Sequence, residues 1–172
     1  DPACGSGIFL VKAFQRLVHR WKRDHAGQTI SPDVMRQILT ENLLGVDKDQ
    51  HAVRVACFSL YLAMCDEIEP RRYWTDVHFP PMRGNRLICS DFFEEGPGFV
   101  TPSDDESAQD AKRYDLIVGN APWGKNLLTE SARKWSADER HPWPVANKDI
   151  GCLFFAKGAA LLKPSGRLAL IQ

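Results

Sequence analysis

Four helices are predicted along the chain, three of them from apolar residues that recur at helical spacing. The first covers residues 8–26, and a second helix is predicted from Ser31, a favourable cap residue, to about Thr40. A third helix is predicted over residues 50–68 and a fourth over residues 150–161. The apolar positions that define the first helix are Leu10, Phe14, Leu17, Val18 and Trp21.

Four short apolar runs lie between or after these helices and are predicted to be strands. They lack the alternation of apolar and polar residues that marks a strand with one face in water. Strands that alternate with helices and are buried on both faces favour an α/β fold with a doubly wound, mostly parallel sheet. The four runs are residues 43–47, 86–89, 114–119 and 167–171.

The remaining segments are polar or rich in proline and glycine, and we expect them to be loops. Residues 71–85 contain several prolines and glycines, residues 96–113 form a polar, acidic insertion, and residues 124–148 show no clear periodicity. The sequence from Lys163 to Gly166 is predicted to turn the chain into the last strand.

Composition narrows the class of protein. The chain has 172 residues, of which 44% are hydrophobic and 26% are charged, as in an ordinary globular domain. No apolar run approaches the ~20 residues of a membrane span, and no signal peptide is visible. Five scattered cysteines without a C-x-x-C pair argue against a disulfide framework and a zinc site, so we expect a cytoplasmic protein. The formal net charge is zero, whereas a DNA-binding domain is usually basic.

A glycine-containing loop, Asp1-Pro2-Ala3-Cys4-Gly5-Ser6-Gly7, opens onto the first predicted helix. Gly5 and Gly7 allow a ligand to approach the backbone at a helix N-terminus, whose amides favour a carboxylate or a phosphate. Leu10 stands where a dinucleotide-binding fingerprint requires a third small residue, and no Gly-Lys-Ser/Thr is present. A simple structural turn remains an alternative for this loop.

Acidic residues follow two of the predicted strands. Asp47 ends the run 43–47, where a carboxylate can accept hydrogen bonds from both hydroxyls of a ribose. Asp91 and Phe92 follow the run 86–89, where an acid can accept from an adenine amino group and an aromatic ring can lie on the base. The alternatives are a helix cap or a surface acid at Asp47 and, at Asp91, a turn acid beside a core phenylalanine. Asp49 is expected to cap the helix that follows it.

The segment Asn120-Ala121-Pro122-Trp123 follows the strand 114–119, where open α/β sheets bind ligands. An exocyclic amino nitrogen is a poor nucleophile because its lone pair is delocalised into the ring. Two acceptors, the Asn120 side-chain oxygen and the Ala121 carbonyl, would localise that pair, and Pro122 restricts Ala121 to extended conformations. Trp123 offers a face on which a base can stack. A proline-containing turn with a packed tryptophan is the alternative.

In order along the chain, these motifs resemble those of the adenine-specific (N6) DNA methyltransferases of restriction–modification and phage-defence systems. The resemblance covers nearly the whole chain. It implies the Rossmann-like fold of the class I S-adenosylmethionine-dependent methyltransferases and S-adenosylmethionine as cofactor. The four matching segments are Asp-Pro-Ala-Cys-Gly-Ser-Gly-Ile-Phe-Leu, Gly-Val-Asp, Ser-Asp-Phe-Phe and Asp-Leu-Ile-Val-Gly-Asn-Ala-Pro-Trp.

The resemblance also implies a role for each site residue. The first loop contacts the methionine part of the cofactor, Asp47 holds its ribose, and Asp91 with Phe92 holds its adenine. The catalytic segment grips a target adenine flipped out of DNA. The residues that the resemblance assigns to the first loop are Asp1, Ala3, Gly5 and Gly7, and those assigned to catalysis are Asn120, Ala121, Pro122 and Trp123. The family usually has proline where Ala121 stands, and we expect activity to survive because alanine also supplies a carbonyl.

The order of the motifs, with the cofactor loop before the catalytic segment, resembles the class that has a C-terminal target-recognition region. We therefore expect residues 1–172 to be a partial catalytic domain, truncated at both ends, with its first strand, its last strands and the recognition region outside the chain. Double-stranded DNA would then be bound mainly by regions outside the chain, with restriction or specificity subunits as candidate partners and no membrane. No metal is implied.

Two other interpretations of the sequence stay open. One is a methyltransferase that acts on a glutamine amide or an RNA base amine, because its chemistry is also the methylation of a planar amino group. The other is a non-catalytic module that retains the methyltransferase fold, for which Ala121 is the only hint.

Overall fold

The computed structural model describes residues 1–94, 114–124, 127–140 and 149–171 of the chain. These residues form two compact units. The N-terminal unit is Cys4–Cys89, and the C-terminal unit joins Asp1–Ala3 to Ser90–Gln172. The predicted polar insertion, residues 96–113, lies outside the described residues.

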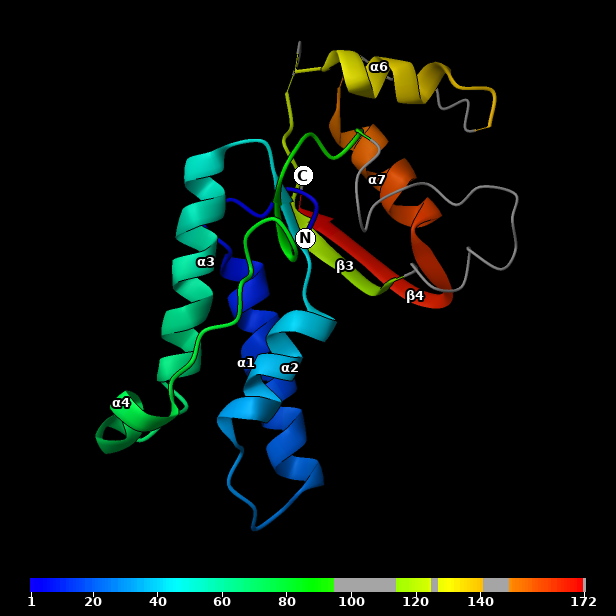
Figure 1. Ribbon diagram of the computed structural model, residues 1–172. Helices are drawn as coiled ribbons and strands as arrows, with labels where there is room; N and C mark the ends of the chain where they lie inside the picture. The colour runs from blue at the N-terminus through cyan, green and yellow to red at the C-terminus, as the bar shows by residue number, and fades with distance from the viewer. Residues whose placement is uncertain (95–113, 125–126, 141–148, 172) are drawn as a thin grey trace. The chain divides into compact units, whose positions relative to one another are not determined.

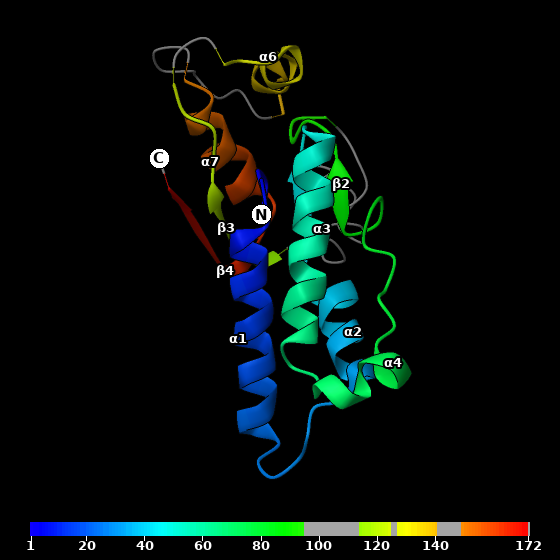
Figure 2. The same cartoon turned by 90° about the vertical axis from the view of Figure 1, so that its left-hand side faces the viewer.

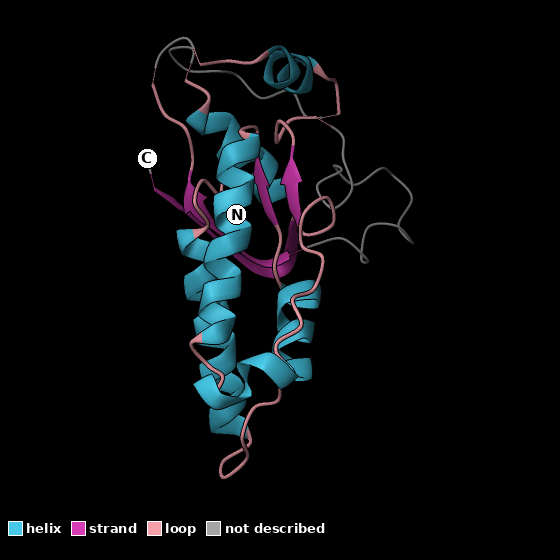
Figure 3. Ribbon diagram, turned by 60° about the vertical axis from the view of Figure 1, so that its left-hand side comes forward, coloured by secondary structure: helices cyan, strands magenta, loops and turns pink. Residues whose placement is uncertain are grey.

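The N-terminal unit is mainly helical and contains one pair of short parallel strands (Figures 1 and 3). Helices α1 and α3 lie side by side, as both Figure 1 and Figure 2 show, and α2 packs on α1. The elements of this unit are α1 (Ile8–Asp24), α2 (Pro32–Asn42), β1 (Gly45–Asp47), α3 (Gln50–Cys65), the 3-10 turn η1 (Pro70–Arg72), α4 (Tyr73–Asp76) and β2 (Leu87–Cys89).

The three long helices of this unit confirm the predictions, which rested on apolar spacing for α1 and α3 and on the cap residue for α2. Leu10, Phe14 and Val18 recur every four residues and form the buried face of α1. The predicted caps are also confirmed: the Ser31 hydroxyl accepts a hydrogen bond from the amide of Val34, and the Asp49 carboxylate accepts one from the amide of His51. The short helices η1 and α4 fall mostly within residues 71–85, so the prediction of a loop there is wrong for residues 71–76.

Strands β1 and β2 pair in parallel, with Val46 opposite Ile88. Gly45 starts β1 at a crowded point, where a Cβ would stand 2.6 Å from Leu10 and 2.9 Å from Leu87. The glycine therefore lets β1 pass close to both α1 and β2.

The C-terminal unit is built on a second parallel pair of strands, with α7 packed on β4 (Figure 1). Its core includes a cluster of aromatic rings from Phe92, Phe93, Trp135 and Phe154. Its elements are β3 (Tyr114–Asn120), α6 (Glu130–Ala137), α7 (Gly151–Ala160) and β4 (Leu162–Ile171).

Strand β4 begins earlier than expected. Leu162 pairs with Tyr114, and Arg167 is the next residue to pair regularly, with Leu116. The residues between them, predicted to be a turn, thus form an irregular bulge within the strand. The bulge adds residues to β4 without ending its pairing with β3.

The prediction that β3 is buried on both faces was wrong. Ile117 is 5% exposed, whereas its neighbour Leu116 is 53% exposed. Helix α7 covers the face of β3 that carries Ile117, because Gly158 of α7 lies against Ile117 and Leu168. Burial therefore alternates along the strand, although its sequence does not.

The parallel pairing of strands that alternate with helices confirms an α/β protein. Helix α6 was missed, since it lies in the segment without clear periodicity and buries only Ala132 and Trp135. In the part of the chain that the structure describes, no helix combines the length and apolar character needed to cross a membrane.

Candidate active site

The glycine loop and the acid after β1 are joined directly in the N-terminal unit. The amide of Gly5 donates a hydrogen bond of 2.8 Å to Oδ2 of Asp47, 42 residues later in the chain. Oδ1 of Asp47 accepts a second bond, of 2.9 Å, from the amide of Asp49. Each carboxylate oxygen keeps a further lone pair that can accept from a ligand hydroxyl.

The two glycines of the loop serve different purposes. Gly7 has φ +84° and is the N-cap of α1, and a Cβ there would stand 2.9 Å from the Ala56 Cβ on α3. Gly5 also has a positive φ, +52°, but a Cβ there would meet nothing within 4 Å. Gly7 therefore allows α1 to approach α3, whereas Gly5 leaves open space above the loop.

Helix α1 begins directly after this loop and carries no acidic residue in its first turn. The amides of a first helical turn lack partners within the helix, and the helix dipole adds partial positive charge there. A carboxylate or phosphate group next to Gly5 and Gly7 would find both hydrogen-bond donors and a favourable field.

Cys4 precedes Gly5 and fixes the loop to β1. Its amide donates a hydrogen bond of 2.9 Å to the carbonyl of Val46. Burial, together with the negative charge of Asp47, raises the pKa of the Cys4 thiol to about 11. The thiol therefore stays protonated near neutral pH and acts as a small apolar group rather than a nucleophile.

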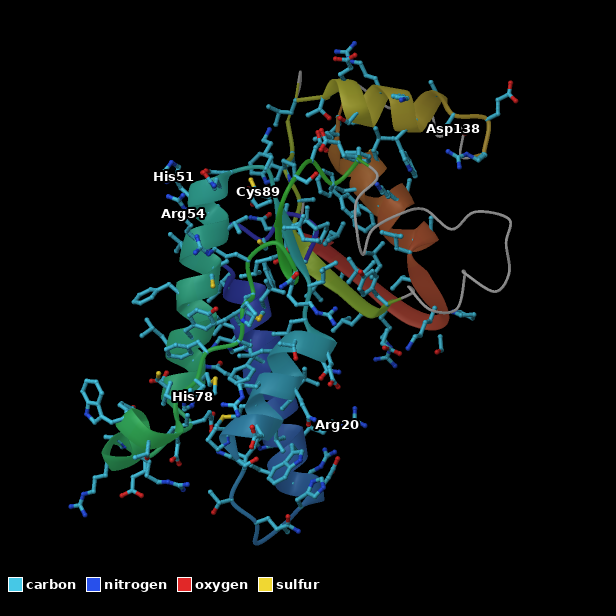
Figure 4. The ribbon with its side chains drawn as sticks, in the orientation of Figure 1. Arg20, His51, Arg54, His78, Cys89 and Asp138 are labelled. Atoms are coloured by element: carbon cyan, nitrogen blue, oxygen red, sulfur yellow. The ribbon has the colours of Figure 1, made fainter. Side chains whose placement is uncertain are left out.

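The ends of β1 and β2 come together within the same unit. Sγ of Cys89, the last residue of β2, donates to the carbonyl of Lys48 at 3.6 Å. Figure 4 shows Cys89 there and shows His51 and Arg54 projecting from the first turns of α3. His51 and Arg54 are both exposed basic side chains. They follow Asp47 closely in sequence.

In the C-terminal unit, Asp1 lies against the end of β3. Its Oδ1 accepts a hydrogen bond of 3.2 Å from the amide of Ala3, and a Cβ on Gly119 would stand only 2.5 Å from the same oxygen. Only glycine permits this approach. The first residue of the glycine loop therefore lies beside the residue that precedes Asn120. Gly119 was not singled out from the sequence, although a glycine within a strand is a signal of close backbone approach.

The catalytic candidates follow from there. Asn120 is the last residue of β3 and is exposed, and its side-chain amide makes no hydrogen bond to any described residue. Ala121 is 1% exposed, Pro122 is half-buried, and Trp123 is 64% exposed. An anchored backbone thus presents an amide and a large aromatic side chain outward at the end of a strand.

The acid and aromatic after β2 form a tight turn in the C-terminal unit. Oδ1 of Asp91 accepts a hydrogen bond of 2.9 Å from the amide of Phe93, and the amide of Glu94 bonds to the carbonyl of Asp91 at 3.0 Å. Phe92 is 5% exposed and stacks on Phe154 with ring centroids 5.1 Å apart. The ring of Phe92 is therefore part of the unit's core, as in the alternative left open by the sequence.

Lys157, in this same region, is not among the site residues predicted from the sequence. Lys157 of α7 is fully buried, and its Nζ donates to the carbonyl of Phe92 at 2.5 Å. The sequence does indicate that residue 157 is buried, because residues 153, 157 and 161 are four apart and share one face of a helix, and Leu153 and Leu161 are apolar.

The structure thus collects the candidate residues into two groups. Each group lies within one unit. Among the residues that the structure describes, no cluster of three or more histidine, cysteine, aspartate or glutamate side chains is arranged to hold a metal ion. The group in the N-terminal unit contains Gly5, Gly7 and Asp47, and the group in the C-terminal unit contains Asp1, Ala3, Asp91, Phe92, Asn120, Ala121, Pro122 and Trp123.

A glycine loop that opens onto a helix, acids that follow parallel strands and an Asn-Ala-Pro-Trp segment at a strand end are together typical of a methyltransferase. The comparison with family models agrees with this class. The model described as Eco57I restriction-modification methylase matches residues 41–172. The chain belongs to this family, which confirms the prediction of a restriction–modification methyltransferase.

Curated relatives support the assignment. The type II restriction enzyme and methyltransferase RM.Eco57I of Escherichia coli is 29% identical over 198 residues, which cover 99% of this chain and 19% of that protein. The adenine-specific methyltransferase PglX of Streptomyces coelicolor is 29% identical over 147 residues, which cover 72% of this chain and 12% of the relative. The putative enzyme RM.MjaORFECS2P of Methanocaldococcus jannaschii is 36% identical over 72 residues, covering 40% of this chain and 6% of its own length. The chain therefore spans less than a fifth of the length of these relatives.

Proposed function

We propose that this chain supplies the cofactor-binding and catalytic residues of an adenine-specific DNA methyltransferase that uses S-adenosylmethionine. The single observation that supports this most strongly is the exposed Asn120 side chain at the end of β3. It lies between Gly119, against which Asp1 packs, and the buried Ala121. The name of the relative PglX, an adenine-specific methyltransferase, agrees with adenine as the target.

The residues of the glycine loop fit the cofactor. The open space at Gly5 and the α1 N-terminus suit the carboxylate of its methionine part, and Asp47 has lone pairs left for its ribose hydroxyls. Asp91 would accept from the adenine amino group with Oδ2, which has no hydrogen-bond partner among the described residues. When bound, S-adenosylmethionine supplies a sulfonium methyl group that a nucleophile can attack.

Asn120 and Ala121 would prepare the nucleophile. The Asn120 side-chain oxygen and the Ala121 carbonyl would accept the two hydrogens of the target amino group, so that its lone pair is localised on nitrogen. That nitrogen would then accept the methyl group that S-adenosylmethionine supplies, with the thioether as leaving group and the amino proton released to water afterwards. Trp123, which is 64% exposed, would stack on the flipped base. Catalysis then rests on orientation and on fixed dipoles.

The same function would require a complete methyltransferase sheet, a DNA substrate and partner proteins. We infer that the two parallel strand pairs belong to a Rossmann-like, doubly wound sheet of the class I methyltransferases, of which residues 1–172 form part. Double-stranded DNA would be the substrate and would contact mainly regions outside this chain. Restriction or specificity subunits would be the protein partners.

The test is methyl transfer from labelled S-adenosylmethionine, catalysed by the full-length natural protein, to duplex DNA, RNA and a glutamine-bearing protein. We expect label on DNA adenine, and we expect Asn120→Ala to lower the rate by about a hundredfold to a thousandfold, as for loss of one preorganised group. Affinity for the cofactor should change by less than about twofold, because Asn120 faces the target base. Label on RNA or protein instead, or full activity of Asn120→Ala, would contradict the proposal.

A matched control is Asn42→Ala. Asn42 is an exposed asparagine at the last position of α2 and has no part in the proposed site. Its replacement should leave the methylation rate unchanged. The contrast between Asn42 and Asn120 then separates loss of a specific amide from a general effect of the substitution.

A further inference from the structure

Lys157 lies at an unusual place for a lysine. It is fully buried, and among the described residues it is the one buried charged side chain. Burial of an ammonium group is costly unless hydrogen bonds replace its water. Phe154, one turn earlier on the same helix, shows that this face of α7 accommodates apolar side chains. The lysine must therefore make contacts that an apolar residue cannot.

The contacts that Lys157 makes with the described residues converge on the turn after β2. Its Nζ donates to the carbonyl of Phe92 at 2.5 Å and lies 3.5 Å from the carbonyl of Glu94. The same nitrogen stands 5.0 Å from the centre of the Phe92 ring and 5.8 Å from that of Phe93. These distances allow cation–π attraction, which offsets part of the cost of burial.

The bond to Phe92 has a geometric consequence for Asp91. The carbonyl of Phe92 and the amide N–H of Phe93 belong to one peptide unit and point in opposite directions, since the unit is planar and trans. Lys157 binds the carbonyl at one side, and Oδ1 of Asp91 binds the N–H at the other. A charged donor on the carbonyl also polarises the peptide and strengthens the bond that its N–H donates.

We propose that Lys157 is a positioning residue that orients the Asp91 carboxylate through the Phe92–Phe93 peptide. This orientation directs Oδ2 of Asp91 to the amino group of the cofactor adenine. The inference rests on the proposed function, because it assigns Asp91 to that adenine. An Asp91 carboxylate oriented in this way would make the C-terminal unit prefer a purine that carries an amino group at position 6.

The test compares two ligands of the full-length natural protein. S-adenosylhomocysteine carries the 6-amino group, whereas S-inosylhomocysteine carries a 6-oxo group that cannot donate to Asp91. The wild-type protein should prefer the adenosyl ligand. Lys157→Met should reduce the ratio of the two dissociation constants by about fivefold or more, as expected for residues coupled through a shared bond. Lys157→Arg, which keeps a charged donor, should retain more of the preference than Lys157→Met.

Two controls separate positioning from a general structural role. Lys163→Met removes a lysine of β4 that pairs with the exposed Asp115, and it should leave the ratio unchanged. In an Asp91→Asn background, Lys157→Met should have almost no further effect on the ratio, because the two residues act on one peptide. A residue that only stabilises the core would lower both affinities together and leave the ratio constant.

The outcomes distinguish the inference from the proposed function. Wild-type protein that binds neither ligand would overturn both. Wild-type protein that binds and discriminates normally, with Lys157→Met doing the same, would overturn only the role of Lys157. Unfolding of both Lys157 variants would also overturn it, because the lysine would then be needed for the fold as a whole.

Discussion

The carboxyl ends of β1 and β3 carry two groups of candidate residues that are organised in opposite ways. At the end of β1, both oxygens of Asp47 accept backbone hydrogen bonds, one from Gly5 and one from Asp49. At the end of β3, the Asn120 side chain is exposed and makes no hydrogen bond to the described residues, and Trp123 is 64% exposed. The first end is closed by its own bonds, and the second is open.

This difference matches the two tasks proposed for them. A site for a cofactor used at every turnover gains from groups that are fixed before the ligand arrives. A site that grips a base extruded from DNA must expose its amide and its aromatic ring, because the base is the partner that they lack. The comparison therefore predicts that substitutions at the first end lower stability as well as cofactor affinity, whereas those at the second act mainly on the methylation rate.

The largest effect is expected at Gly7. Alanine there would be held at φ +84° with its Cβ 2.9 Å from Ala56, so α1 and α3 must separate. Backbone strain and overpacking together should lower the free energy of unfolding by about 2–4 kcal/mol. Thermal unfolding of the full-length protein, followed by circular dichroism, measures this loss.

Gly5→Ala is the matched control for Gly7→Ala. It imposes the same kind of strain, at φ +52°, but its Cβ meets nothing within 4 Å. The expected cost is about 1 kcal/mol, from the left-handed backbone alone. Equal losses for the two variants would show that packing against α3 does not explain Gly7.

Asp47→Ala should have the next largest effect. It removes two hydrogen bonds to a charged acceptor and should cost about 1.5–3 kcal/mol of stability. Hydrogen exchange reports on the loss directly, because the amides of Gly5 and Asp49 should exchange faster. Asn120→Ala should change stability by less than about 0.5 kcal/mol, as for an exposed side chain. Similar losses for Asp47 and Asn120 would remove the distinction between a closed and an open end.

Much of the fold could be predicted because its helices bury regular apolar faces. Phe14 and Val18 of α1 lie four residues apart and are both buried, so spacing alone located the helix. Helix α6 has only Ala132 and Trp135 on its buried side, too few to produce a recognisable period. The exposure of Leu116 depends on which face of β3 is covered by α7, and the local sequence carries no information on that.

The candidate site also contains residues that the sequence identifies and others that only the tertiary structure shows. Residue types and their order along the chain identified Asp47 and Asn120, since strand ends and loops can be located from local patterns. The bond from Gly5 to Asp47 joins residues 42 positions apart, and only the tertiary structure brings them together. Lys157 was missed because a lysine is ordinarily exposed. Its helical spacing with Leu153 and Leu161 was the one available sign of its burial.

Within the proposed catalytic segment, the smaller effect on the methylation rate is expected at Pro122, which holds the backbone of the open end. Pro122→Ala frees Ala121 from its restriction to extended conformations and increases the freedom of the unfolded chain. Stability should fall by about 0.4–1 kcal/mol, and the methylation rate should fall by about twofold to fivefold as the Ala121 carbonyl loses its fixed direction. Single-turnover methylation of duplex DNA measures the rate, and affinity for S-adenosylmethionine should stay constant. A rate equal to that of the wild type would show that the burial of Ala121, which is 1% exposed, already fixes this carbonyl without the proline.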